Sequence, residues 1–296
     1  MDLVTFAPKF PRPGETVVGN SFLTYAGGKG ANQAVAVSRM GARSAMVGRV
    51  GGDIFGPQLL DGLTTAGVDI TGVGINPNER SGIAVIGIDE TAQNFITQIL
   101  GANDTCGPSE AAAVKHRLPS AAALLLQLEV SIDLSLEVAR EATTLGVMVM
   151  LDPGPIRPVP KELLNLCDVI TPNETEAQAL VNFPVTGPKS AAEAALVLLD
   201  MGIGTVVVKL GAQGAYFANS SIGGLLLPFD VAAMDSVAAG DAFNGALAVS
   251  LTEGKDLRQA VTIACAAGAL SVTKTGAQDS MPERELVEKL VRNQPR

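Results

Sequence analysis

The chain has 296 residues, a formal net charge of −9, 47% hydrophobic residues and 17% charged residues. This length and composition favour one large, well-packed α/β domain. The sequence has no Lys/Arg-rich run and no Trp, which argues against nucleic acid as a partner.

The cysteine and histidine contents limit the cellular compartment and the kinds of site that we expect. Cys106, Cys167 and Cys265 are far apart and form no CxxC motif, so we expect a reduced, cytoplasmic compartment. His116 is the only histidine, which excludes a His-based triad or a multi-His metal site within one chain. No signal peptide and no apolar run long enough to span a bilayer occurs, so we expect no membrane association.

Along the chain, apolar runs alternate with Ala-rich helical patterns. This rhythm predicts a Rossmann-like α/β fold, a mainly parallel sheet with helices on both faces. The expected buried strands are 44–50, 122–128, 146–151, 168–171 and 205–210. The expected helices are 30–40, 132–144, 191–201, 241–251 and 257–273.

Two segments break the rhythm. Residues 15–26 read as a strand pair, and residues 82–99 read as a β-hairpin with alternating apolar residues around a polar turn. Short antiparallel pieces outside a parallel sheet indicate a small β lid that would exclude water from a site. The alternative is an ordinary edge hairpin.

The first chemical motif is Gly27-Gly-Lys-Gly-Ala-Asn32, between an apolar strand and a helix. Its glycines allow a ligand to approach the backbone closely, and Lys29 and Asn32 offer donors to hydroxyl oxygens. The spacing is not that of a P-loop. A plain tight turn remains an equal alternative.

The second motif is Asp235-Ser-Val-Ala-Ala-Gly-Asp-Ala-Phe-Asn-Gly245. A turn of small residues that opens into a helix leaves backbone N–H groups unpaired and makes an anion site. Asp241 competes with an anion there, which makes sense if it takes a proton from a hydroxyl that attacks a phosphoryl group. The alternative for this Asp is a helix N-cap.

Four weaker signals follow, and the first three each have a structural alternative. Asn173 and Glu176 share a helix face and could hold the waters of a hydrated Mg²⁺, or cap the helix. The 209–214 turn could lie along a nucleotide or close a hairpin. Glu129 ends an apolar strand where α/β sheets gather ligands, or it forms a salt bridge or cap. Residues 271–280 read as a loop.

Together and in this order, these segments resemble the ribokinase-like, or phosphofructokinase-B type, family of carbohydrate kinases, and most closely its ribokinases. The resemblance covers essentially the whole chain and rests on 13–16, 27–32, 127–129, 171–176, 235–245 and 273–278. It implies one ribokinase-like kinase domain over 1–296 with a lid formed by 15–26 and 82–99. It also implies the reaction of ATP with D-ribose at the 5-hydroxyl to give ADP and ribose 5-phosphate.

The resemblance assigns roles to individual residues. Asp241 would be the general base, and the amides of Ala238, Ala239 and Gly240 an anion hole. The sugar would be bound by Asp2, Gly28, Lys29, Gly30, Asn32, Glu129 and Asp241. ATP would contact Asn173, Lys209, Leu210, Gly211, Ala212, Gln213, Gly214, Gly240 and Cys265. Glu176 and Asn173 would place Mg²⁺ through water, and an activating K⁺ would bind at Asp235, Val237, Ser271, Lys274, Gly276 and Ser280. A homodimer through the lid is also implied.

The sequence departs from the family pattern in several places. Cys265 stands where relatives often carry His or Asn, Lys209 where ribokinases often have Thr, and 151–155 replaces a more usual Asn-Pro-Ala-Pro form with no assigned function. The first strand of the family is apparently missing, so we expect a misplaced start and an Asp2 with no strand to hold it. The remaining alternatives are another sugar or nucleoside kinase of this family, or a non-catalytic sugar-binding paralogue.

Overall fold

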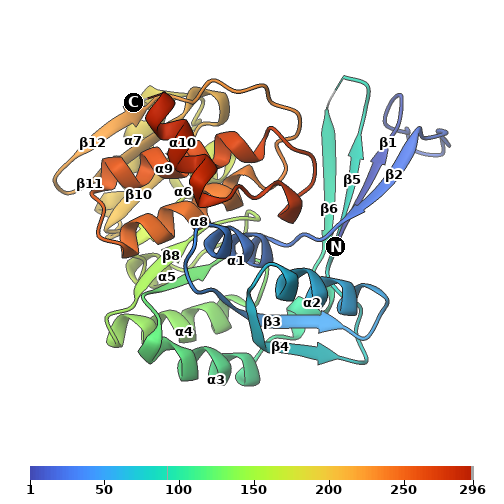
Figure 1. The fold of residues 1–296 in the computed structure, drawn as a ribbon, viewed down its shortest axis with the longest axis horizontal. Coiled ribbons are helices and arrows are strands. Elements are labelled where there is room, and N and C mark those ends of the chain that lie inside the picture. Colours follow the sequence, from blue (N-terminus) through green and yellow to red (C-terminus); the bar gives the residue numbers. More distant parts are fainter. Residues whose placement is uncertain (92, 295–296) are drawn as a thin grey trace.

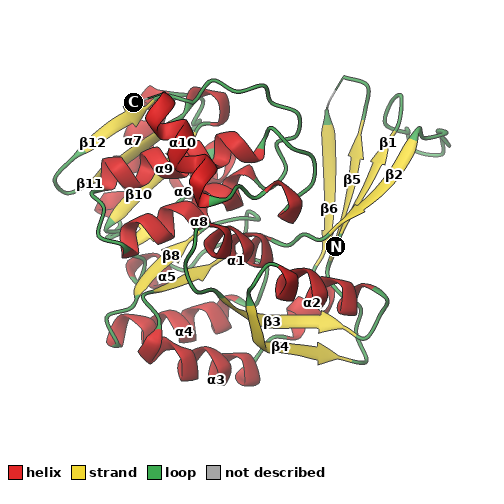
Figure 2. Ribbon diagram, viewed as in Figure 1, coloured by secondary structure: helices red, strands yellow, loops and turns green. Residues whose placement is uncertain are grey.

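The computed structural model describes residues 1–91 and 93–294. Figure 1 shows a layered α/β body with a small upright sheet standing beside it, and the N-terminus lies at the base of that small sheet. The secondary structure is mapped onto the same view in Figure 2.

The main sheet has six strands in the order β12-β11-β10-β9-β8-β7. The four strands from β7 to β10 are parallel, and β11 and β12 extend the sheet as antiparallel strands. Their bounds are β7 Ala123–Leu126, β8 Met148–Leu151, β9 Val169–Ile170, β10 Thr205–Lys209, β11 Ala215–Asn219 and β12 Gly223–Leu226. The mainly parallel sheet expected from the sequence is therefore confirmed.

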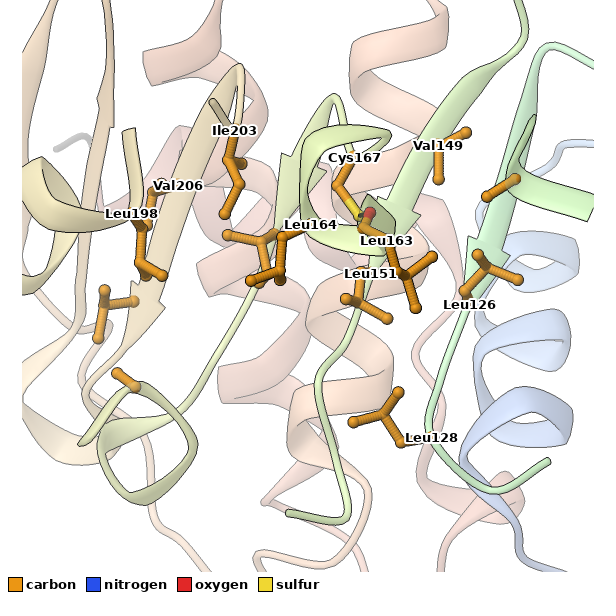
Figure 3. Close-up of a cluster of buried hydrophobic side chains, with 14 of the residues drawn as sticks. Leu126, Leu128, Val149, Leu151, Leu163, Leu164, Cys167, Leu198, Ile203 and Val206 are labelled. Atoms are coloured by element: carbon orange, nitrogen blue, oxygen red, sulfur yellow. Dashed lines mark hydrogen bonds between the residues drawn. The ribbon is translucent and has the colours of Figure 1, made fainter. Parts of the chain in front are cut away.

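Helices cover both faces of this sheet because its strands are apolar on both sides. Val206 and Val208 pack into one core cluster and Val207 into another. The first face is covered by α3 (Pro108–Arg117), α4 (Ile132–Thr144), α5 (Lys161–Asn165), α6 (Glu174–Val181) and α7 (Pro188–Asp200), and part of its core is drawn in Figure 3. The second is covered by α8 (Ala239–Thr252) and α9 (Leu257–Ser271), with α1 (Lys29–Arg39) against α8 and α10 (Arg284–Asn293) against α9.

The parallel sheet is interrupted beyond β7. Among the described residues, β3 (Ala45–Gly51) pairs only with β4 (Asp69–Asn76), and the two strands form a separate sheet. The helix α2 (Phe55–Thr65) packs against this pair. Residues of β3 and of β7 line one continuous cavity. We call the space between the edges of β3 and β7 the gap. The expectation that the first strand of the family fold is missing stays a prediction.

The backbone of β7 shows that the gap is an open edge. The carbonyls of Ala122 and Leu126 accept hydrogen bonds from the amides of Met148 and Asp152. Because successive residues of a strand direct their N–H and C=O groups to opposite sides, those of Ala123 and Leu125 point toward the gap. Correspondingly, strand residues such as Leu124 and Leu125 are only half-buried.

The small sheet has four strands in the order β2-β1-β5-β6, with bounds β1 Asp2–Phe6, β2 Ser21–Tyr25, β5 Ile83–Ile88 and β6 Asn94–Ile99. The hairpin expected over 82–99 is present as β5 and β6. The strand pair expected within 15–26 is not: only β2 is a strand there, and its antiparallel partner is β1.

The expectation about Asp2 is wrong. We expected it to lack a supporting strand, but it is the first residue of β1, paired with both β2 and β5. The Met1 amino group donates to the Gly82 carbonyl at 2.8 Å. Pairing on both edges therefore holds Asp2 without any preceding strand.

The five buried strands and the five helices expected from the sequence all occur, within a few residues of their expected ends. The elements not expected from the sequence are β1, β4, β12, α2, α3, α5 and α10, and the four 3-10 turns at Gly101–Thr105, Leu118–Ser120, Gly211–Gln213 and Gln278–Ser280. Within the described ranges, no helix combines the length and the apolar character needed to cross a bilayer.

Candidate active site

A large cavity of about 1580 Å³ opens between the carboxyl ends of the main-sheet strands and the small sheet, and extends into the gap beside β7. Ligands of open α/β sheets bind at this end of the strands. The cavity is lined by most of the predicted site residues, namely Asp2, Gly28, Lys29, Gly30, Asn32, Glu129, Asn173, Lys209, Gly211, Val237, Ala238, Ala239, Gly240 and Asp241.

The N-terminus of α8 provides the anion-binding geometry. Ala238 has φ 59° and ψ 10°, a left-handed conformation that is rare for a residue with a side chain and clusters at functional sites. In the described chain, the amides of Ala238 and Gly240 donate to no protein acceptor. The Ala239 amide makes only a long 3.4 Å contact with the Ser236 carbonyl. These donors face the cavity at the positive end of the helix dipole.

Asp241 lies in the first turn of α8 and is 5% exposed. Its Oδ2 accepts from Asn32 Nδ2 at 2.9 Å and its Oδ1 from Gln33 Nε2 at 3.0 Å. Burial raises the pKa of Asp241, assisted by the nearby Asp152 charge, while Lys29 and the two hydrogen bonds act in the opposite direction. A carboxyl with a raised pKa is a stronger base for a hydroxyl proton.

Close packing of α1 against α8 places Asn32 and Gln33 beside Asp241. Gly28 has φ 99°, so the turn before α1 needs a glycine. A side chain at Gly245 would collide with Ala36 and the Val37 backbone, and the glycine lets the two helices approach. The helix that follows the 27–32 motif thus places the side-chain amides of Asn32 and Gln33 against the Asp241 carboxylate of the 235–245 motif.

Asp152 is a second buried carboxylate, and the sequence reading gave it no function. It follows β8, is 1% exposed, and accepts from two lysines: Lys29 Nζ at 2.9 Å and Lys209 Nζ at 3.0 Å. Gln33 Nε2 donates to it at 3.0 Å. Burial alone would raise the pKa of Asp152, but the two lysines outweigh burial and lower it.

The side of the cavity below the small sheet carries hydroxyl-binding groups. Glu129 accepts from the Lys29 amide at 2.9 Å and from Gln98 Nε2 at 2.5 Å. Burial raises the pKa values of Glu129 and of Asp2. Asn32 Oδ1 is buried without a hydrogen-bond partner among the described residues, so this acceptor is available to a ligand hydroxyl.

The segment after β9 forms a helix cap. Asn173 is the N-cap of α6: its Oδ1 accepts from the Glu176 amide and the Thr175 hydroxyl, while Glu176 Oε2 accepts from the Asn173 amide. Capping, one of the two interpretations left open, is therefore present. This cap leaves Glu176 Oε1 without a hydrogen-bond partner in the described chain. The Oε1 atom lies near the Lys29 side chain and the Gly154 backbone.

The predicted nucleotide turn closes the β10–β11 hairpin. Lys209 ends β10 beside Asn173, Gly211–Gln213 form a 3-10 turn, and Gly214 has φ 90°. Of this turn, Lys209 and Gly211 line the cavity, whereas Leu210, Ala212, Gln213 and Gly214 do not. Cys265 lies on α9 against two core clusters, away from the cavity lining, and burial raises its pKa to about 12.

The predicted K⁺ loops meet at Asp235. Its Oδ1 accepts from the Val237 amide and its Oδ2 from the Gly276 amide, each at 3.0 Å. Ser271 and Ser280, which flank Gly276 in the sequence, are buried, and Lys274 is exposed. In the described chain, no cluster of three or more His, Cys, Asp or Glu side chains forms a metal site.

The structure adds functional candidates that sequence reasoning missed: Gln33, Gln98, Gln127 and Asp152. Gln127 Nε2 donates to Gln33 Oε1 at 2.7 Å and so fixes the orientation of that amide. One signal was available, because Asp152 directly follows a buried strand, the position that drew attention to Glu129. Gln127 directly follows β7 in the same way, whereas Gln33 and Gln98 carry no such signal because their partners come from distant segments.

The α/β body, the small sheet over the cavity and the anion site at a helix N-terminus together define a sugar-kinase class of fold. A family model for pfkB family carbohydrate kinase matches residues 1–284. The chain belongs to this family and is accordingly a transferase that phosphorylates an alcohol group.

The relatives agree with this assignment. The chain is 38% identical over 287 residues to a ribokinase of Haemophilus influenzae, covering 96% of this chain and 93% of that protein. A Thermotoga maritima ribokinase structure matches with a TM-score of 0.87 and 36% identity, covering 99% and 96% of the two chains. An Arabidopsis thaliana ribokinase complexed with ribose and ATP matches with a TM-score of 0.88 and 33% identity, covering 98% and 95%.

Proposed function

We propose that this chain phosphorylates D-ribose at its 5-hydroxyl with ATP, and that Asp241 is the general base. The observation that carries the proposal is the position of Asp241: a buried carboxylate with a raised pKa, next to unpaired amides at the start of α8. A base and an anion hole must lie side by side for a hydroxyl to attack a phosphoryl group.

The sugar would bind below the small sheet. Asp2 and Glu129 are carboxylates that accept hydrogen bonds from hydroxyls, and the buried Asn32 Oδ1 lacks a donor. Such a set of acceptors suits a small polyhydroxylated molecule rather than an apolar base. The related Arabidopsis ribokinase, which was solved with ribose and ATP, supports this choice of substrates.

The same geometry supports a proposal for the chemical step. Asp241 takes the proton of the attacking hydroxyl, and the Ala238, Ala239 and Gly240 amides accommodate charge on the transferred group. Mg²⁺ supplies charge neutralisation of the ATP phosphates when bound, and Glu176 Oε1, free of other partners in the described chain, is the group that would hold it through water. A K⁺ ion would bind where Asp235 joins its two loops.

We also propose that the small sheet acts as a lid and pairs with that of a second copy. Its strands and their loop carry a group of exposed apolar side chains, which are Val18, Phe22, Leu23, Phe95, Ile96 and Ile99. An exposed apolar surface of this kind is typical of an interaction site.

A substrate panel tests the function. Purified protein is assayed for ATP turnover with ribose, 2-deoxyribose, fructose and adenosine, and the sugar product is identified by mass spectrometry. We expect kcat/KM to be highest for ribose. Turnover of fructose or adenosine equal to that of ribose would replace the ribose assignment with another kinase of this family. Calorimetric binding of ribose without any turnover would favour the non-catalytic sugar-binding paralogue.

A further inference from the structure

Two lysines converge on one buried carboxylate beside the anion site. Lys209 Nζ and Lys29 Nζ lie 3.0 and 2.9 Å from opposite oxygens of Asp152, whose side chain is 1% exposed. Lys29 is the first residue of α1 on the proposed sugar side, and Lys209 is the last residue of β10 on the proposed nucleotide side. Asp152 therefore joins the two halves of the proposed site.

Two ammonium groups share the Asp152 carboxylate. The charges of Asp241 and Glu176 also act on Lys29. Among the described residues, the only ion pair of Lys209 is with Asp152. A buried ion pair contributes little to stability on average, because desolvation offsets the attraction. An ammonium group at a cavity wall is instead suited to bind an anion, and Lys209 lies at the wall of this cavity.

Lys209 points at the anion site. An ideal Cβ placed on Gly240 would lie 3.4 Å from Lys209 Nζ, so the ammonium group sits against the backbone of the α8 first turn. An ammonium group has three N–H donors. Among the described residues, Lys209 Nζ uses one of them, toward Asp152 Oδ1, and the other two are available to an oxygen held at the Gly240 amide.

We propose that Lys209 is a catalytic residue that donates hydrogen bonds to the phosphoryl group in transfer, and that Asp152 is the positioning residue that holds it there. This inference rests on the proposed kinase function. In the step, a bond forms between the sugar oxygen and the terminal phosphorus while the bond from phosphorus to the ADP oxygen breaks. The hydroxyl proton goes to Asp241, and Lys209 keeps its protons throughout.

The first test replaces Lys209 with methionine, which keeps the length of the side chain and removes the charge. Loss of one preorganised donor to the transferred group lowers kcat by roughly 10²–10³-fold. We expect ribose affinity, measured by calorimetry, and the melting temperature to change little. Lys115→Met is the matched control, since Lys115 pairs with Glu137 at 2.6 Å on the surface between α3 and α4.

A binding measurement separates this proposal from the kinase proposal. The β,γ-imido analogue of ATP carries the terminal phosphate and ADP lacks it. We expect Lys209→Met to reduce the preference for the analogue over ADP by roughly 10- to 100-fold, the value of a charge-assisted hydrogen bond. If the wild-type protein phosphorylates no sugar, the proposed function fails, yet this ratio still tests Lys209. An unchanged ratio together with an unchanged kcat would overturn the role of Lys209.

The second test concerns Asp152. Asp152→Asn keeps a hydrogen-bond acceptor and removes the charge that holds both lysines. If Asp152 acts through Lys209, the double variant with Lys209→Met loses less kcat than the product of the two single losses. The KM for ribose reports separately on Lys29. Losses in kcat that multiply fully would show that Asp152 does not act through Lys209, and would overturn its positioning role.

Discussion

Asp241 and Asp152 share a single hydrogen-bond donor: Gln33 Nε2 lies 3.0 Å from Asp241 Oδ1 and 3.0 Å from Asp152 Oδ2. The two carboxyls are nevertheless shifted in opposite directions. Burial raises the pKa of Asp241, whereas the two lysines lower that of Asp152 despite its burial. One carboxyl is thus made more basic and the other is kept ionised.

These opposite shifts predict opposite effects on stability. The folded-state pKa of Asp241 lies above its unfolded value, so its ionised form costs stability as the pH rises past the unfolded value. Asp241→Asn should therefore raise the melting temperature at pH 7. The folded-state pKa of Asp152 is depressed, so its contribution is present above the unfolded pKa and lost as the pH falls through the folded pKa. Asp152→Asn should lower the melting temperature at pH 7.

Thermal unfolding of both variants at pH 7, and of Asp152→Asn along a series toward acid pH, checks this pair of expectations. The deficit of Asp152→Asn should shrink as the pH falls. Asp200→Asn, a change at the exposed end of α7, serves as the control for the loss of one negative charge. Shifts of the same sign for the two site variants would contradict the electrostatic account.

Asp241→Asn also tests the base assignment. We expect kcat to fall by roughly 10²–10⁴-fold, the usual contribution of a general base. Ribose affinity should be largely retained, because the amide keeps the size and one acceptor of the carboxylate. Steady-state kinetics and calorimetry with ribose provide the two readouts. Near-full activity in this variant would mean that another group takes the proton.

The gap beside β7 predicts a gain of stability on strand addition. A short apolar segment fused before Met1 can pair with the free edges of β3 and β7 and cover apolar surface on both faces. We expect a higher urea midpoint and a higher kcat than in the chain as it stands. An extension of equal length made of Gly, Ser and Pro is the control, and an equal gain from that control would rule out strand pairing.

The Asp235 loop pair predicts a dependence on monovalent cations. Replacing K⁺ with Na⁺ or with Tris at constant ionic strength should lower activity, because a cation beside the 235–240 turn would order the anion hole. Asp235→Ala should lower activity in K⁺ and largely abolish the difference between cations. Activity that is indifferent to the cation in the wild-type protein would refute a cation role for Asp235.

The apolar surface of the small sheet predicts self-association. Ile96 is 58% exposed on β6, and Ile96→Asp places a charge in the proposed contact. Light scattering after size-exclusion chromatography should show a dimer for the wild-type protein and a monomer for the variant. Ile54→Asp, an exposed apolar position just before α2, is the comparison and should leave the mass unchanged.

Sequence patterns were reliable where the local signal is strong. The helix expected over 132–144 has the same bounds as α4, and the buried apolar runs became β3, β7, β8, β9 and β10. Sequence patterns did not predict elements that form only through pairing with segments distant in the sequence. β1 was not foreseen, because Asp2–Phe6 is a strand only through its pairing with β2 and β5.

The sequence by itself determined the family, the parallel α/β architecture and the glycine-rich turns that lead into α1 and α8. These follow from local periodicity and from turn residues that need no distant partner. Only the tertiary structure decided how the charged groups are coupled. Gln33, Asp152 and Lys209 come from three separate segments and meet where strands end, and their environment sets their chemistry. Burial and distance between side chains, which no linear spacing encodes, raise the pKa of Asp241 and lower the pKa of Asp152.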